Sequence, residues 1–135
     1  MKPKTKNIAL ANSVDAVHPN GNGTYTAGAD IAQGQPLKFG ADDRTVVPTT
    51  AATDIAIGIA LDRALAGEPV PAALLGTFTG TVLLNASGAV SAGDQLNALG
   101  ATAAAGDIVI GRALATASAD EPVEIAHQVA AKMTA

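Results

Sequence analysis

The sequence predicts an all-β fold, a small β-sandwich or barrel built from two related halves, with an extended N-terminal arm. Three observations predict it: a passage that occurs twice, an alternation of large and small residues within that passage, and short runs of strand-forming residues separated by turns. Short strands that recur at roughly 8–12-residue spacing are typical of sandwiches and barrels.

The duplicated passage covers residues 54–70 and 107–123, which read DIAIGIALDRALAGEPV and DIVIGRALATASADEPV without a gap. A glycine turn before each passage is also repeated, as IAQGQPL at residues 31–37 and VSAGDQL at residues 90–96. The two copies of the long passage are 53 residues apart, and the two copies of the glycine turn are 59 residues apart. The first half therefore has six additional residues between these features, which we assign to a loop around Asp42-Asp43-Arg44. Two copies are too few for a solenoid, so the sequence predicts one compact domain made of two pseudo-repeats, about 30–75 and 89–128.

Alternation within the repeated passage favours strands over helices. Ile55, Ile57 and Ile59 fall on one face if the side chains alternate, whereas Ala56 and Gly58 fall on the other. Small residues on one face indicate that another layer of backbone approaches that face closely.

One position breaks the equivalence of the two copies, because Arg112 stands where the first copy has Ile59. A buried, unpaired arginine is costly. We therefore expect the second half to be partly exposed at Arg112, or to contact a partner there.

Three regions follow from the pattern: an extended arm at residues 1–23, a β domain at residues 24–128 and a short tail at residues 129–135. Within the β domain, the alternation of threonines with Phe78 and Val82 predicts a strand over Thr77–Leu84.

The arm is polar and interrupted by proline and glycine, and when extended its 23 residues span up to roughly 75 Å. Such a segment can add a strand to the sheet edge of a partner or lie in a groove, and the alternative is a disordered tail. Its basic start suits an acidic surface, and the alternative there is a solvated terminus. The residues that we expect to dock the arm are Lys2, Lys4, Lys6, Ile8, Leu10, Val14 and Val17.

Composition argues against several classes of partner. The residues after position 6 hold five basic and twelve acidic side chains, a net charge of −7, which does not favour DNA binding by counterion release. With only Tyr25, Phe39 and Phe78 as aromatic residues, no stacking platform for single-stranded nucleic acid is expected. The absence of cysteine excludes disulfides and thiolate metal ligands, and the sequence has neither a membrane-spanning apolar run nor the apolar core of a secretion signal. We expect no nucleic-acid partner, no membrane contact and synthesis in a cytoplasm.

Candidate chemical groups are few. Asp54 and Asp107 occupy equivalent positions before the repeated strands, which is compatible with a catalytic carboxylate pair or with two turn caps. We favour turn caps, and we expect a solvated turn at Asp42-Asp43 because the spacing of a calcium loop is missing. His18 and His127 have no cysteine to complete a zinc site. The sequence therefore predicts no enzyme, no metal and no cofactor.

The glycine turns at residues 31–37 and 90–96, the Ile-Gly-x-Ala-Leu strands at 57–61 and 110–114, and the turn at Gly67-Glu68-Pro69-Val70 together resemble the capsid decoration, or cement, proteins of tailed bacteriophages. The resemblance covers about residues 24–128 and departs from the family pattern in the shorter loop of the second half. It implies a β-barrel or sandwich on the outer surface of the phage head, often a homotrimer at local threefold positions, with an arm that binds the major capsid protein or a neighbouring subunit. The protein would then be made in the host cytoplasm and would stabilise the shell by bridging capsomers.

Two other functions remain open at this point. The glycine-turn passage also resembles β-clip domains appended to sugar enzymes, which would make the chain a carbohydrate- or ligand-binding module with a pocket of convergent polar groups. The other alternative is a small enzyme that uses Asp54 and Asp107, and this function requires the two carboxylates to lie close together.

Overall fold

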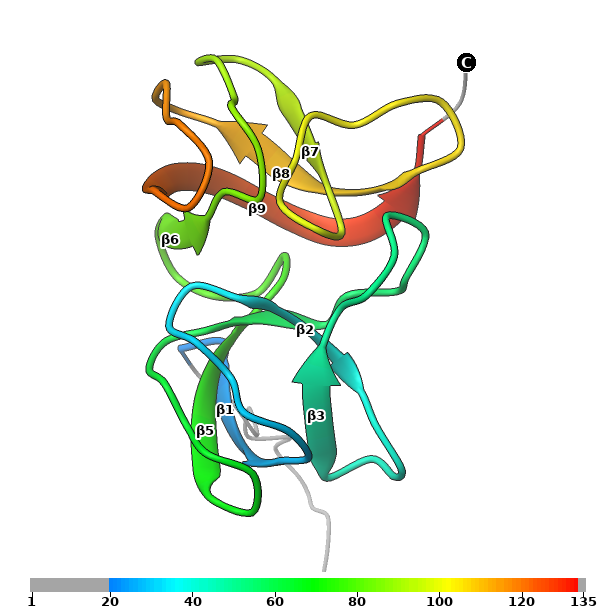
Figure 1. Cartoon of the computed structure of the whole chain (residues 1–135), viewed down its shortest axis with the longest axis vertical. Coiled ribbons are helices and arrows are strands. Elements are labelled where there is room, and N and C mark those ends of the chain that lie inside the picture. The colour runs from blue at the N-terminus through cyan, green and yellow to red at the C-terminus, as the bar shows by residue number, and fades with distance from the viewer. Residues whose placement is uncertain (1–19, 134–135) are drawn as a thin grey trace, which may run out of the picture.

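The computed structural model of the chain describes residues 20–133, and the predicted all-β fold is confirmed (Figure 1). Nine strands and no helix occur among these residues. The strands are β1 (Asn22–Ala27), β2 (Pro36–Phe39), β3 (Thr45–Pro48), β4 (Gly58–Ala60), β5 (Pro69–Leu74), β6 (Val82–Asn85), β7 (Gln95–Asn97), β8 (Ile108–Ala113) and β9 (Pro122–Lys132). Over the same range, no helical segment has the length and apolar character needed to cross a membrane.

The strands form a closed barrel and an open sheet, which lie one above the other in Figure 1. The barrel has the order β1-β3-β2-β4-β5, and the four-stranded sheet has the order β6-β9-β8-β7. Every named pair is antiparallel except β1 and β3, which run parallel.

The barrel and the sheet are two versions of one unit. An isolated bridge joins Ile31 to Ala64 in the first half, and the equivalent bridge joins Val90 to Ala117 in the second. The glycine turns repeat as well: Gly34 and Gly93 donate their N–H groups to the Ala60 and Ala113 carbonyls, both at 2.8 Å. Strands β1, β2, β4 and β5 therefore correspond to β6, β7, β8 and β9.

The strand β3 has no counterpart in the second half, and its absence explains why one half is closed and the other open. The first half has six additional residues between its glycine turn and β4, as the offsets of 59 and 53 require. In the second half, residues 101–103 cover the edge of β7 instead, through bonds from Asn97 N–H to the Ala101 carbonyl and from Ala103 N–H to the Gln95 carbonyl. The shorter segment pairs with the edge of β7 but forms no strand that pairs with β6, so the sheet stays open.

The two halves share a hydrophobic core. The barrel interior holds its own cluster, which includes Leu37, Val46 and Ala60. A larger cluster combines Ile59 of β4 with side chains of the second sheet such as Ile125. Strand β4 is thus buried on both faces, with Ala60 in the barrel and Ile59 in the shared core.

Three segments differ from the sequence-based expectation. Ile55 is 63% exposed, because β4 covers only Gly58–Ala60. Residues 77–81 form a connector rather than a strand, since Gly76 and Gly80 adopt positive φ angles of 83° and 95° that end the extended backbone. At the two ends, Asn22 and Gly23 belong to β1 and not to an arm, and β9 continues to Lys132, past the expected domain limit at residue 128, because its last residues pair with Ile108 and Val109 of β8.

The glycines of the repeated strand are closely approached by backbone, but by the neighbouring strand of the same sheet and not, as expected, by another layer. The expected large face does not form either, since Ile57 packs against the barrel cluster and Ile59 lies in the shared core. A Cβ atom on Gly58 would lie 2.7 Å from the Ala73 carbonyl oxygen, and one on Gly111 would lie 2.7 Å from the Ala126 carbonyl oxygen. Both contacts are with the backbone of the neighbouring strand, which cannot move aside alone.

We predict that Gly58→Ala and Gly111→Ala each lower the free energy of unfolding by about 1–3 kcal/mol, as overpacking does. Gly88→Ala is the matched control, because a Cβ there meets no atom within 4 Å, and its effect should stay within about 0.5 kcal/mol. Denaturant unfolding of the three variants measures this, and equal stabilities would contradict the close approach.

A second backbone feature distinguishes the copies. Asp120 has a φ angle of +67°, and the equivalent residue in the first half is Gly67, with a φ angle of +88°. An L-residue in this left-handed region costs roughly 1–2 kcal/mol, although aspartate tolerates it better than most.

We predict that Asp120→Gly raises the free energy of unfolding by about 0.5 kcal/mol, because the relief of this strain exceeds the entropy that glycine loses on folding, about 0.5–1 kcal/mol. Asp120→Ala, which keeps the strain, should give no gain. Thermal unfolding of both variants tests this; an Asp120→Gly variant less stable than Asp120→Ala would show that the aspartate side chain is needed there.

Candidate functional site

The predicted capsid-binding residues Lys2, Lys4, Lys6, Ile8, Leu10, Val14 and Val17 lie outside the described residues, so the structure shows only where this segment joins the body. The Asn20 carbonyl accepts a 3.1 Å hydrogen bond from Thr79 N–H, and the Gly21 carbonyl accepts one of 2.7 Å from Leu74 N–H. A Cβ on Gly21 would collide with the backbone of Thr77. The N-terminal segment therefore joins the body at the connector between β5 and β6, where the two halves meet.

His127 of β9 holds the same connector. Its Nδ1 accepts a 2.9 Å hydrogen bond from Gly76 N–H, and its Nε2 lies 3.0 Å from the Gly80 carbonyl oxygen. Because Nδ1 is an acceptor, we assign the ring proton to Nε2, which donates to Gly80. The ring also packs against Phe78, with 6.1 Å between the ring centroids.

The role of His127 is thus structural: it fixes the connector to which Asn20 is bonded. These bonds could not be predicted from the sequence, since they join residues 51 and 47 positions apart. The glycines that flank the connector were the available signal.

Asp54 caps a turn, as expected. Its Oδ2 accepts hydrogen bonds from Thr50 N–H at 2.8 Å and Ala51 N–H at 3.0 Å, and it lies 3.1 Å from Lys38 Nζ. The Thr50 hydrogen bond, with smaller contributions from Lys38 and Ala51, lowers the pKa of Asp54 from 3.8 to about 2 against the opposing effect of desolvation. At neutral pH this group is ionised and has no proton to donate.

Asp107 caps the equivalent turn of the second half. Its Oδ2 accepts a 2.9 Å hydrogen bond from Ala104 N–H and a 3.2 Å bond from the Asn97 side-chain amide. The two turns are neighbours, since Ile108 N–H donates to the Ala52 carbonyl at 2.9 Å. Each carboxylate nevertheless serves its own turn, so the arrangement gives no support to a catalytic carboxylate pair.

The Asp42-Asp43 turn is also local. Asp42 Oδ1 accepts a 2.9 Å hydrogen bond from Arg44 N–H, and this bond is the main reason why the pKa of Asp42 is lowered. Across residues 20–133, no three histidine or acidic side chains gather into a group that could hold a metal ion.

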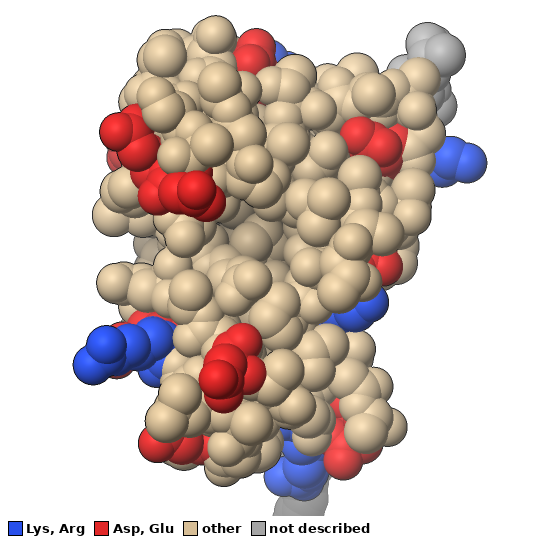
Figure 2. All heavy atoms as spheres, in the orientation of Figure 1, with Lys and Arg blue, Asp and Glu red and all other residues tan. Residues whose placement is uncertain are grey.

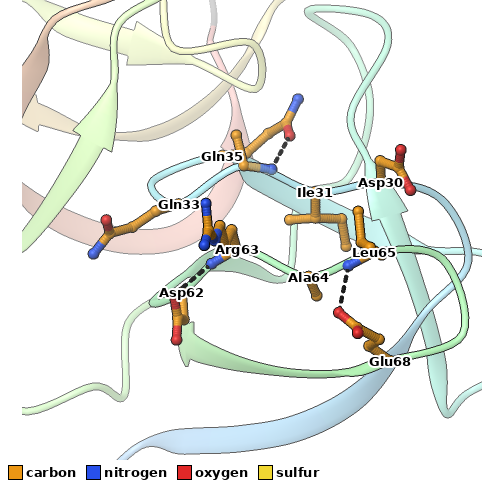
Figure 3. Close-up of a pocket in the computed structure, with 10 residues that line it drawn as sticks. Asp30, Ile31, Gln33, Gln35, Asp62, Arg63, Ala64, Leu65 and Glu68 are labelled. Atoms are coloured by element: carbon orange, nitrogen blue, oxygen red, sulfur yellow. Dashed lines mark hydrogen bonds between the residues drawn. The ribbon is translucent and has the colours of Figure 1, made fainter.

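A groove of about 1000 Å³ lies between the loops at residues 30–35 and 62–68 of the first half (Figure 3). Its polar side chains point in different directions rather than toward a common centre. Several are already bonded to their own loops: Gln35 Oε1 accepts from Ala32 N–H, Asp62 Oδ1 from Arg63 N–H and Glu68 Oε1 from Leu65 N–H. No aromatic side chain lines the groove, so it lacks the convergent polar and aromatic groups that a carbohydrate-binding module would need.

A second groove, about 480 Å³, lies where the two halves meet. Its lining is mainly apolar and comes from both halves, with Leu61 from the first, Phe78 from the connector, and Leu83 and Pro122 from the second. Phe78 immediately precedes Thr79, whose N–H binds the Asn20 carbonyl, so this groove lies close to Asn20, the first residue that the structure describes.

The net charge of residues 1–19 is opposite in sign to that of the described body. Residues 20–133 contain five basic and eleven acidic side chains, a net charge of −6, whereas residues 1–19 contain three lysines and one aspartate, a net charge of +2, and the two values sum to the −4 of the whole chain. Figure 2 shows the charged groups mainly around the periphery of the visible face, with an uncharged and hollowed region between the two halves.

The Asp54 cap predicts a specific acid sensitivity. Because its pKa is lowered, the stability that this carboxylate contributes is complete above pH 3.8 and is lost as the pH falls toward about 2. We expect Asp54→Asn to remove this part of the pH dependence of the unfolding free energy. Lys38→Met should reduce it only in part, since the Thr50 hydrogen bond remains. Unfolding measured from pH 5 to pH 2 tests this, and an unchanged slope in Asp54→Asn would refute the assignment.

Comparison with known proteins agrees with the fold and with the resemblance drawn from the sequence. The N base of the head fiber protein gp8.5 of bacteriophage phi29 has a similar structure, with a TM-score of 0.63 and 15% sequence identity over 84% of this chain and 98% of that one. At this identity the likeness establishes the fold alone. No curated protein matches the sequence. The family model for phage cement proteins matches residues 17–129, most of the chain. The protein therefore belongs to the phage cement protein family, whose members are structural proteins of the phage head.

Proposed function

We propose that this protein binds the outer surface of the phage head and stabilises the shell by bridging adjacent capsomers. The observation that carries the proposal is the match of the cement protein family to residues 17–129, which include the whole body up to Val129. The structure supports it through what the body offers: two fused β units, polar groups engaged in their own turns, and an arm of opposite charge that begins between the halves.

The stabilisation follows from mass action. A protein that binds the assembled shell and not its separated parts opposes opening of the shell. Each contact can be weak, since many equivalent contacts around a closed shell add up through multivalency. We propose that the bodies associate with one another, as a homotrimer, while the arms bind the major capsid protein.

The arm has the composition and the reach for this task. Nineteen residues span up to roughly 65 Å when extended, well beyond the body from which they start. The positive charges of Lys2, Lys4 and Lys6 would attract acidic side chains on the shell. The acidic body would repel the same side chains. Ile8, Leu10, Val14 and Val17 supply the apolar contacts with which an added strand or a groove-bound segment is held.

No cofactor, metal, nucleic acid or membrane takes part in this function. The protein would be made in the host cytoplasm, and its stable location would be the exterior of the virion.

We predict that removing residues 1–19 lowers the affinity for undecorated heads at least tenfold while the body remains folded. Asn20 and Gly21 are kept, because their carbonyls bind Thr79 and Leu74. Co-sedimentation with undecorated heads measures the binding, and thermal unfolding checks the fold. Unchanged binding would refute the role of the arm.

Two variants separate the contributions within the arm. Lys2, Lys4 and Lys6→Gln should weaken binding most at low salt, because exposed charges are screened as salt rises. Ile8, Leu10, Val14 and Val17→Ser should weaken it at every salt concentration. Lys132→Gln, which changes an exposed lysine at the end of β9, is the matched control for lost charge.

A further inference from the structure

The internal repeat shows that the same face of the unit is used differently in the two halves. In the first half, the outer face of β4 and β5 is covered by the second sheet. The residues of this face all pack in or against the shared core: Ala56, Ile59, Leu61, Ala73 and Leu75. In the first half, this face of the repeated unit therefore forms a packing contact with another sheet.

The second half presents the equivalent face to solvent. The corresponding residues, 53 positions further along, are Val109, Arg112, Leu114, Ala126 and Gln128. Val109 is buried, but the other four are exposed, and Leu114 is 46% exposed. This observation also explains why the second half accepts Arg112 where the first half has Ile59.

An exposed leucine on β6 extends the same face. Leu83 is 58% exposed, whereas its neighbours Val82 and Leu84 are buried, so Leu83 points to the outer side of the sheet. Leu83 is paired with Glu124 of β9, and Leu114 N–H donates a 2.8 Å hydrogen bond to the Glu124 carbonyl. The two exposed leucines therefore flank Glu124 on adjacent strands.

We propose that this outer face of the second sheet, defined by Leu83, Arg112, Leu114, Glu124 and Ala126, binds a second copy of this chain. The inference rests on the proposed function, in which the bodies associate, and it names the surface through which they do so. The face combines apolar groups with one positive and one negative side chain, the composition that lets a surface contact its own copy.

Charge favours a second copy as the occupant. The described body carries a net charge of −6, so two bodies repel unless opposite charges meet at the contact. Arg112 is one of the five basic residues of the body, and Nη1 of its side chain is held by a 2.6 Å hydrogen bond to the Gly93 carbonyl. Glu124, whose Oε2 accepts a hydrogen bond from the Thr81 hydroxyl, lies on the next strand as the opposite charge. In a homotrimer the copies are related by a threefold axis, so the Glu124 carboxylate of one neighbour meets Arg112 and the Arg112 guanidinium of the other neighbour meets Glu124.

The test compares Leu83→Glu with Leu65→Glu, both as purified full-length protein without heads. Leu65 is 61% exposed, nearly the same as Leu83, but it lies on the barrel loop at residues 62–68 and outside the proposed face. In sedimentation velocity, we expect the wild-type protein and Leu65→Glu to self-associate with the same dissociation constant. For Leu83→Glu we expect this dissociation constant to be at least tenfold higher. Leu114→Glu is a second variant in case Leu83→Glu fails to fold, with thermal unfolding as the check.

A charge exchange tests the pairing directly. Arg112→Glu should weaken association, and the double variant Arg112→Glu with Glu124→Arg should restore it. If Arg112→Glu acted only by removing the hydrogen bond to Gly93, the second substitution would not restore association. A monomeric wild-type protein at all concentrations, equal association of Leu83→Glu and Leu65→Glu, or no recovery in the double variant would each overturn the proposal. Head binding through the arm is measured separately, so failure here would leave the arm-deletion result standing.

Discussion

The burial of Ile59 between the barrel and the second sheet is the contact on which the rest of the structure depends. The second half lacks a strand equivalent to β3, so its sheet stays open and its apolar side chains need a cover. The outer face of β4 and β5 provides that cover, and the two halves form one packed body. The connector between the halves then has a fixed course, which His127 holds through Gly76 and Gly80. The N-terminal segment begins from this fixed point.

Local features of the sequence predicted much of this fold. The duplication, the glycine turns and the caps at Asp54 and Asp107 depend on neighbouring residues, and the structure agrees with each. Exposure of Arg112 was also predictable, because burial of an unpaired charge is costly. The closure of one half and not the other was not predictable in the same way, since a six-residue difference appears only as a longer loop until the pairing of β3 with β1 and β2 is known. The bonds of His127 and the extension of β9 to Lys132 likewise depend on contacts between distant segments.

The proposed function resides in surfaces and not in a reactive pocket. The groove between residues 30–35 and 62–68 has polar groups that already bind their own loops, and the groove between the halves is mainly apolar. We propose that the acidic body and the basic N-terminal residues make two different contacts, one between bodies and one to the shell. This division of tasks suits a cement protein, which has to hold a lattice at many equivalent positions.

An electron cryo-microscopy reconstruction of undecorated heads incubated with the purified protein tests the central claim most directly. The account predicts density for the two-part β body on the outside of the shell, across the boundary between adjacent capsomers, with the N-terminal segment continuing from the connector to the capsid surface. Heads without added density, or density on the inner surface or confined to the centre of single capsomers, would contradict it.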